Sequence, residues 1–437
     1  MTPIEPLFTR EMRKTHTILA PSMATIQFRI LVNVLKDEGY TVKLLENEGP
    51  QIIRKGLTYV HNDTCYPALL VIGQMIDALD SGAHDLKRTA LAITQTGGGC
   101  RASNYIHLLR KALDKAGYAD IPIVSLNLKG MNRNSGFRIT TRMLRKGIAA
   151  LLCGDTLMLL KNQVSPYEVH HGETSSLVDT WIDRLSDQYR RGRGYRKREM
   201  AEDLNRMVRE FAAIETDYDR PVVKVGIVGE IYMKYAPLGN NHLEDFLASQ
   251  SCEVMIPGIL GFLLYGLQNQ LEDIRLYGGT RRRKLLMGTI MRHVLGLERI
   301  MIDAVKRVDR FTAPVPFTHT VKTAEEVISL GCKMGEGWLL TAEMRDLAQL
   351  GYRNIICVQP FGCLPNHIVG KGMIRRLKEM DDSVNIVPID YDPGATRVNQ
   401  ENRIKLMLAV ANENRLGGID GSPGSPLRTG RAEAPQD

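Results

Sequence analysis

The sequence lacks the features of several classes of protein. It has no run of about 18 apolar residues, and its longest candidate, residues 254–267, is broken by a proline and three glycines, so we expect no membrane-spanning helix. The N-terminal segment contains the charged residues Glu5, Arg10 and Glu11. A signal peptide would have its apolar core at these positions. We therefore expect a cytoplasmic protein without a membrane partner. Its 43% hydrophobic and 24% charged residues are typical of a globular chain.

A disulfide framework is not expected either. The seven cysteines are an odd number, in a chain for which we expect no secretion. Such a count favours metal-binding, catalytic or buried thiols over disulfides. The cysteines are Cys65, Cys100, Cys153, Cys252, Cys332, Cys357 and Cys363.

No complete glycine motif for binding phosphate occurs. The nearest approach to a P-loop is at residues 368–372, where Gly370 and Lys371 match the glycine and lysine of the motif. The position of the first glycine is then Pro365, and Gly372 stands in place of the hydroxyl residue. Residues 226–229 match only a fragment of a dinucleotide fingerprint. The sequence therefore predicts no ATPase or dinucleotide site of its own.

The net charge of +8 is a mild excess, concentrated in part in two basic runs, residues 190–198 and 281–284. A solvated surface is the default interpretation of such runs, and docking of an acidic protein or of phosphate groups is the alternative. No aromatic residues are interleaved in the manner of a nucleic-acid site, so no nucleic-acid partner is expected.

Strand and helix patterns alternate in two series. The first series has five predicted strands, at 16–20, 41–45, 57–60, 90–94 and 121–126. Its predicted helices are at 26–35, at 69–79 and in a segment that ends near Ala116. The second series has predicted strands at 221–228, 252–256, 355–358 and 384–389, and then a helix at 399–410. Such alternation predicts an α/β fold, here two Rossmann-like lobes with parallel sheets. We place the first lobe at 1–165, a helical connector at 166–220, the second lobe at 221–416 and a disordered tail at 417–437.

Three cysteines follow predicted strands and begin predicted helices. Cys65, Cys100 and Cys363 come after strands 57–60, 90–94 and 355–358, and open α/β sheets bind ligands at such strand ends. Pro67 and Pro365, two residues after their cysteines, suit a first helical turn. A helix N-terminus favours the thiolate form that binds metals. The pattern predicts a metal site between the lobes, with plain buried thiols as the alternative.

The remaining polar candidates are weaker. Cys357 lies inside the apolar strand 355–358, where a buried thiol is the default and a fourth ligand the alternative. Cys153, Cys252 and Cys332 are predicted to be structural. Glu230 follows strand 221–228 and is the candidate catalytic residue if it faces the cleft between the lobes. A solvated turn carboxylate is the other interpretation of Glu230, and the stronger one for Glu336.

Five long segments resemble the acyl-CoA dehydratase activase-related proteins, especially the part of the large activases that is similar to 2-hydroxyacyl-CoA dehydratase subunits. They are Asn-Asp-Thr-Cys-Tyr-Pro-Ala (62–68), Thr-Gln-Thr-Gly-Gly-Gly-Cys-Arg-Ala-Ser-Asn-Tyr (94–105), Val-Gly-Glu-Ile-Tyr-Met-Lys-Tyr (228–235), Gly-Glu-Gly-Trp-Leu-Leu-Thr-Ala-Glu-Met (335–344) and Gln-Pro-Phe-Gly-Cys-Leu-Pro-Asn-His (359–367). The resemblance covers roughly residues 15–412. It implies an anaerobic setting and a [4Fe–4S] cluster. Cys65, Cys100 and Cys363 match the motif cysteines, and Cys357 falls where such proteins commonly carry one.

The resemblance also implies a redox function. The long activases begin with ATPase domains that this sequence does not contain, so we expect a separate ATP-hydrolysing activator protein. The leading hypothesis is an iron–sulfur protein that transfers single electrons. A second is a dehydratase- or reductase-like subunit that binds an acyl-CoA substrate at an open iron, and a third is a zinc-bound or metal-free interaction subunit. We expect one cubane per chain and favour the open iron, because Cys357 lacks the turn chemistry of the other three cysteines. A homo-oligomer is left open.

Overall fold

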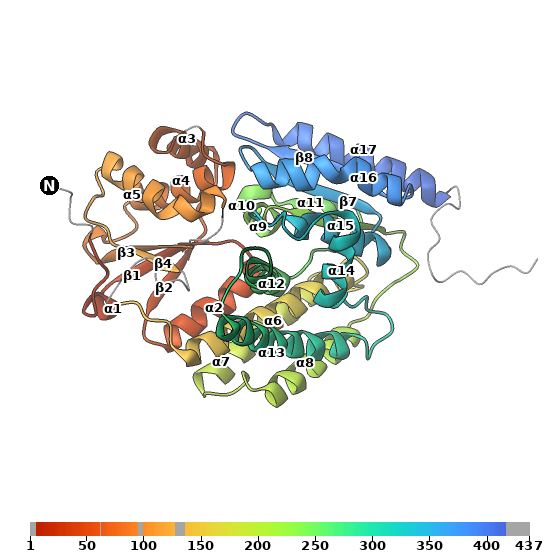
Figure 1. The fold of residues 1–437 in the computed structure, drawn as a ribbon, viewed down its shortest axis with the longest axis horizontal. Helices are drawn as coiled ribbons and strands as arrows, with labels where there is room; N and C mark the ends of the chain where they lie inside the picture. The colour runs from red at the N-terminus through yellow and green to blue at the C-terminus, as the bar shows by residue number, and fades with distance from the viewer. Residues whose placement is uncertain (1–5, 62, 95–98, 127–135, 417–437) are drawn as a thin grey trace, which may run out of the picture.

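The computed structural model describes residues 6–61, 63–94, 99–126 and 136–416. These form two α/β lobes beside a layer of long helices (Figure 1). Each lobe contains a four-stranded, all-parallel sheet, and the strand orders β2-β1-β3-β4 and β6-β5-β7-β8 follow the same pattern. The predicted α/β fold with two Rossmann-like lobes is confirmed. Among the described residues, no helix is long and apolar enough to cross a membrane.

The first lobe is built on a short parallel sheet. Its strands are β1 (Thr17–Pro21), β2 (Thr41–Leu45), β3 (Thr89–Thr94) and β4 (Ile123–Leu126). Its helices are α1 (Met12–Thr15), α2 (Thr25–Asp37), α3 (Pro50–Tyr59), α4 (Tyr66–Asp80) and α5 (Tyr105–Ala116). Helix α4 is buried on nearly all sides, which agrees with its run of apolar residues.

One predicted strand of the first lobe is wrong. Residues 57–60, expected to be a strand, are the last turn of helix α3 and its C-cap Val60. A short apolar run fits a strand or a buried helix equally well. Here the helical spacing of Ile52 and Gly56, which are both buried, decides the outcome. Cys65 therefore follows a helix, and the proposed equivalence of three strand ends holds for two cysteines only.

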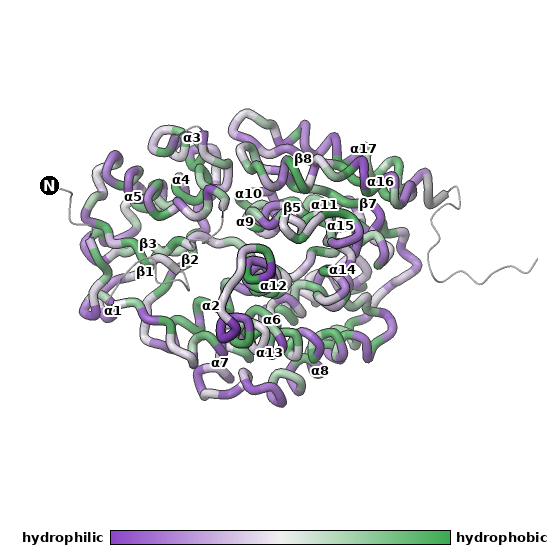
Figure 2. Tube along the Cα trace, viewed as in Figure 1, coloured by the Kyte–Doolittle hydropathy of each residue, from purple (hydrophilic) through white to green (hydrophobic). Residues whose placement is uncertain are grey.

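The helical layer is larger than the expected connector. Residues 166–220 include α7 (Glu173–Arg190) and α8 (Lys197–Ala212), and the long α6 (Thr141–Val164) precedes them. Two helices from later in the chain, α12 (Ile259–Tyr277) and α13 (Arg281–Val305), pack against α6, and α13 also packs on α8. The first lobe rests on this layer because α2 packs against α6 and α7. In Figure 2 the inward faces of these helices are hydrophobic and their outer faces hydrophilic.

The second lobe repeats the parallel arrangement. Its strands are β5 (Val223–Gly229), β6 (Cys252–Met255), β7 (Asn354–Pro360) and β8 (Asn385–Tyr391). Its other helices are α9 (Ile231–Tyr235), α10 (Pro237–Asn240), α11 (Leu243–Ser249), α14 (Phe317–Val327), α15 (Trp338–Gln349), α16 (Ile374–Met380) and α17 (Arg397–Leu416). The tail predicted to be disordered, residues 417–437, lies outside the described residues.

Candidate functional site

Three cysteines that are far apart in the sequence line one cavity. Cys65, Cys100 and Cys363 all face a space of about 720 Å³. The first lobe contributes Cys65 and Cys100, and the second lobe contributes Cys363. Helix α12 forms a third wall through residues such as Tyr265 and Asn269. The predicted convergence of the three cysteines between the lobes is therefore present in the fold.

Cys65 is the N-cap residue of α4, and Pro67 occupies the first turn as expected. The next residue, Tyr66, donates its backbone N–H to the carbonyl of Phe361 in the second lobe, with an N–O distance of 2.9 Å. Gly362 has a φ of +73°, and a Cβ atom there would lie 3.1 Å from the Cα of Cys65. The loops that carry Cys65 and Cys363 are thus in direct backbone contact across the lobes.

Cys100 and Cys363 come after β3 and β7, on the carboxyl-end side of both strands. Cys100 precedes a 3₁₀ turn, Arg101–Asn104, that leads into α5. The glycine turn before it, at residues 95–98, lies outside the described residues. Cys363 follows β7 and precedes a short π-helical turn, Asn366–Gly370, and its backbone N–H donates to Pro360 at 3.3 Å.

Tyr105 is a site residue that the sequence did not single out. Its hydroxyl lies 3.0 Å from the Sγ of Cys65, and both side chains are buried. Tyr105 is also the first residue of α5, four residues after the 3₁₀ turn begins at Arg101. It therefore links the Cys65 loop to the segment that carries Cys100. The only signal in the sequence is an aromatic residue five positions after a cysteine.

The electrostatic state of the thiols differs from the sequence expectation. Burial raises the pKa of Cys65 to about 11, although hydrogen bonds from Tyr105 and from the backbone of Ala68 act in the opposite direction. Burial also raises the pKa of Cys363, and the carboxylates of Glu336 and Glu230 raise it further. The thiolate bias expected from helix N-termini is therefore wrong for these two free thiols, because desolvation outweighs it. A bound metal would have to displace their protons.

Two carboxyl groups face the same cavity. Glu230 is the N-cap of α9, and its Oε2 accepts the backbone N–H of Met233 at 2.9 Å. The Oε1 of Glu336 accepts the backbone N–H of Ile231 at 3.1 Å. Burial raises the pKa of both side chains, and their mutual repulsion adds to the effect for Glu230. At neutral pH the pair therefore tends to hold a proton.

The positions of the two glutamates agree with the sequence prediction to different degrees. Glu230 faces the cavity, which is the position required of the candidate catalytic residue. Glu336, expected to be a solvated turn residue, is only 7% exposed, so that interpretation is wrong. The signal that could have found it is its pair of flanking glycines. Gly335 and Gly337 both have positive φ angles, and they turn the chain so that Glu336 points inward.

Cys357 lies away from the cavity. It belongs to β7, is fully buried, and is not among the residues that line the space with the other three cysteines. Its Sγ lies 3.6 Å from the Oδ1 of Asn366, which is also buried. Cys153 and Cys252 are buried, as expected of structural thiols, whereas Cys332 is exposed.

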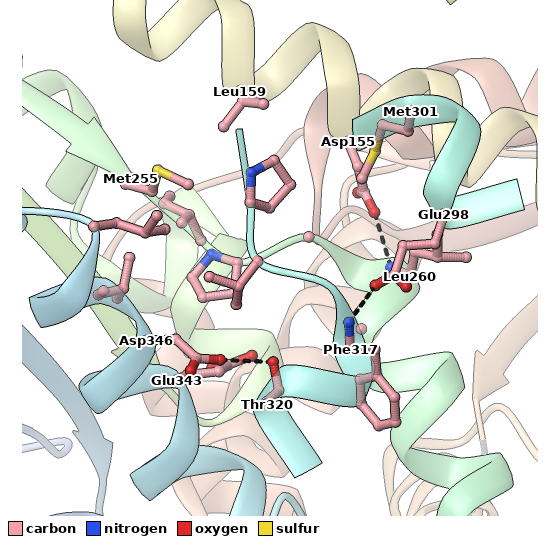
Figure 3. A pocket seen from close by; sticks show the side chains of 18 of the residues that line it. Asp155, Leu159, Met255, Leu260, Glu298, Met301, Phe317, Thr320, Glu343 and Asp346 are labelled. Carbon is pink, nitrogen blue, oxygen red and sulfur yellow. Dashed lines mark hydrogen bonds between the residues drawn. The ribbon is translucent and has the colours of Figure 1, made fainter. Parts of the chain in front are cut away.

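Two further findings bear on the site. Within residues 6–61, 63–94, 99–126 and 136–416, no group of three His, Cys, Asp or Glu side chains is arranged to hold a metal ion. A smaller cavity of about 100 Å³ is separate from the cysteines and is lined by four acidic side chains, Asp155, Glu298, Glu343 and Asp346 (Figure 3).

A comparison of the sequence with protein-family models finds no match. A comparison with curated proteins also finds none.

Proposed function

We propose that this chain is an iron–sulfur protein of a 2-hydroxyacyl-CoA dehydratase/activase-like system, which transfers single electrons together with a separate ATP-hydrolysing activator. The observation that carries the proposal is that Cys65, Cys100 and Cys363 line one cavity. These are the three cysteines on which the family resemblance rests. Chance would rarely bring together three motif cysteines from three separate loops and two lobes.

The residues present fit a [4Fe–4S] cluster in their donor chemistry. Cys65, Cys100 and Cys363 would each hold one iron through a thiolate, and the cluster would supply one-electron redox chemistry when bound. The cavity of about 720 Å³ exceeds the space that a single ion needs. Gly99, Gly335 and Gly362 present bare backbone around it. Cys357 is fully buried within β7 and does not line the cavity, which supports an arrangement with three protein thiolates.

The chain's own side chains have roles that follow from their contacts. The hydroxyl of Tyr105 shares a hydrogen bond with the Sγ of Cys65 and so fixes that side chain. Burial of Cys65 limits the access of water to its sulfur. Burial raises the pKa of Glu230 to about 8 and raises the pKa of Glu336 as well, so the charged forms of both side chains are disfavoured beside the cavity.

A catalytic subunit that binds an acyl-CoA substrate is the second candidate function. The buried carboxyl pair favours it, because a protonated carboxyl beside an open metal position can act as a general acid. The size of the cavity would also admit a small acyl group. Turnover of 2-hydroxyacyl-CoA thioesters by the purified chain, abolished in a Glu230→Gln variant that keeps its iron, would favour this function over electron transfer alone.

The decisive experiment is iron and sulfide analysis of the anaerobically purified chain. We expect about four irons per chain and a brown absorbance, because a cubane contains four irons. Cys65→Ser, Cys100→Ser and Cys363→Ser should each lower the iron content strongly, whereas Cys153→Ser and Cys252→Ser should leave it unchanged. Absence of iron, or full iron content in the Cys100→Ser variant, would reject the proposal. Zinc in place of iron would favour the interaction subunit.

A further inference from the structure

The turn between α12 and α13 carries an unusual combination of exposed side chains. Four apolar residues there are largely accessible, with exposed fractions of 42% for Leu276, 76% for Tyr277, 69% for Leu285 and 57% for Leu286. The basic run that begins α13 lies between them in the sequence and is also exposed. We define the hairpin patch as Leu276, Tyr277, Arg281, Arg282, Lys284, Leu285 and Leu286.

The cations of the hairpin patch are not neutralised by any carboxylate among the described residues. In the described part of the structure, Arg281, Arg282 and Lys284 form no ion pair with a carboxylate. The guanidinium of the neighbouring Arg283 donates to the neutral side chain of Gln270 at 2.6 Å. Some exposed arginines of other helices, by contrast, pair with a glutamate four residues later, as in Arg198–Glu202 and Arg206–Glu210. The positions four residues after the basic run hold leucine, methionine and glycine instead. The positive charge is therefore available to a partner.

The hairpin patch adjoins the cavity that contains the cysteines. Gln270 and Asp273 of α12 line this cavity, and Tyr277 follows Asp273 by about one helical turn. Lys333, another lining residue, forms an ion pair with Asp273, and its Nζ lies 5.4 Å from the ring centre of Tyr277. A protein seated on the patch would therefore lie beside the edge of the cavity.

From these observations we propose that the hairpin patch is the docking surface for a small acidic electron-carrier protein. Acidic groups on the partner would pair with Arg281, Arg282 and Lys284, and its apolar contacts would cover Leu285 and Leu286. The class of carrier rests on the proposed function, whereas the docking surface itself rests on charge and exposure. A second copy of this chain is a poor occupant, because two copies packed patch to patch would bring like charges together.

Nucleic acid and anionic membrane are the competing partners for a basic surface. The patch contains a single aromatic residue, Tyr277, which does not make the stacking platform typical of single-strand binding. Its exposed leucines carry no hydrogen-bonding group for a base edge. The position of the patch beside a cavity lined by cysteines favours a protein over a lipid surface.

The test is calorimetric titration of the full-length chain with a bacterial two-cluster ferredoxin, a small acidic electron carrier, at low and high salt. We expect binding that weakens as salt rises, because the charges at the patch become screened. An Arg281→Glu/Arg282→Glu variant should bind about tenfold more weakly at low salt, since it places acidic groups against the acidic carrier. A Leu285→Ser/Leu286→Ser variant should lower the affinity at both salt concentrations.

The matched control is Arg191→Glu/Arg193→Glu, which makes the same change of charge in the other basic run. It should bind like the wild type. No measurable binding of ferredoxin to the wild type, or equal loss in both charge-reversed variants, would overturn the proposal. Patch-dependent binding to phosphatidylglycerol vesicles or to single-stranded RNA, without binding to ferredoxin, would also overturn it. This binding needs no cluster, so iron analysis of the same preparation tests the proposed function separately.

Discussion

At the scale of single residues, the site combines cysteine thiols with a hydroxyl and two carboxyl groups that alter their hydrogen bonding and pKa. The Sγ of Cys65 has a hydrogen-bond partner in the hydroxyl of Tyr105. The pKa of Cys363 is raised by burial and further by the carboxylates of Glu336 and Glu230. These neighbours come from different loops, so each depends on the fold for its place. Their effects on the thiols can be separated by conservative substitutions that remove one polar atom at a time.

The first prediction concerns Tyr105. A Tyr105→Phe protein should keep its iron but have a more negative reduction potential, because a hydrogen bond to a ligand sulfur stabilises the reduced, more negative cluster. The measurement is an EPR-monitored redox titration. Tyr265→Phe is the control, since its hydroxyl lies in the same cavity but donates to the backbone oxygen of Lys333 at 2.9 Å. An unchanged potential in Tyr105→Phe would contradict a role for its hydroxyl.

The second prediction concerns Glu298, which lines the smaller cavity in Figure 3. Burial raises its pKa from 4.5 to about 7, although its carboxylate accepts the backbone N–H of Phe317. A raised pKa in the folded state means that the native protein holds a proton that the unfolded chain loses above pH 4.5. Its contribution to stability is therefore present below pH 4.5 and is lost as the pH rises toward 7.

Glu298→Gln should remove this pH dependence while keeping an acceptor for Phe317. The variant should gain stability relative to the wild type between pH 5 and pH 8, by up to about 3 kcal/mol. Thermal unfolding at both pH values measures the effect. A difference between the variant and the wild type that is the same at pH 5 and pH 8 would show that Glu298 does not titrate in this interval.

At the scale of elements, the close packing of α3 on α4 positions Cys65. A Cβ atom at Gly73 would lie 2.2 Å from the backbone oxygen of Ile52, and one at Gly56 would lie 2.4 Å from the oxygen of Leu69. Because these contacts are with backbone atoms, no rotation of a side chain can relieve them. The two glycines therefore set the distance between the helices and, through it, the start of α4.

The third prediction follows from this contact. Gly73→Ala should destabilise the protein by about 1–3 kcal/mol, the usual range for overpacking. Gly147→Ala, on α6, is the control because its nearest neighbour would lie 3.9 Å from the new Cβ. It should stabilise the protein by about 0.5–1 kcal/mol, the helical preference for alanine. Urea unfolding measures both changes, and equal effects would disprove the steric argument.

At the scale of the whole molecule, the cavity exists only where the two lobes and α12 meet. Cys65, Cys100 and Cys363 line it, while Cys357 is fully buried and does not line it. The fourth prediction is that Cys357→Ala keeps the iron content and the EPR spectrum, whereas Cys363→Ser loses the cluster. Loss of the cluster in Cys357→Ala would show that Cys357 is a ligand and would remove the open iron.

The amino-acid sequence by itself determined the parallel α/β lobes, because strand-length apolar runs alternate with amphipathic helices. It also singled out Cys65, Cys100 and Cys363, which the fold brings to one cavity, through glycine and proline at their turns and through the resemblance. It did not separate a strand from a helix at residues 57–60, because so short a segment, Leu-Thr-Tyr-Val, fits both periods. The sequence does not single out Tyr105, because a lone aromatic carries no local signal, and it favours a solvated turn for Glu336, because the inward turn made by Gly335 and Gly337 is visible only in the fold. Only the tertiary structure decided their roles, since burial and contacts between lobes arise when distant segments pack.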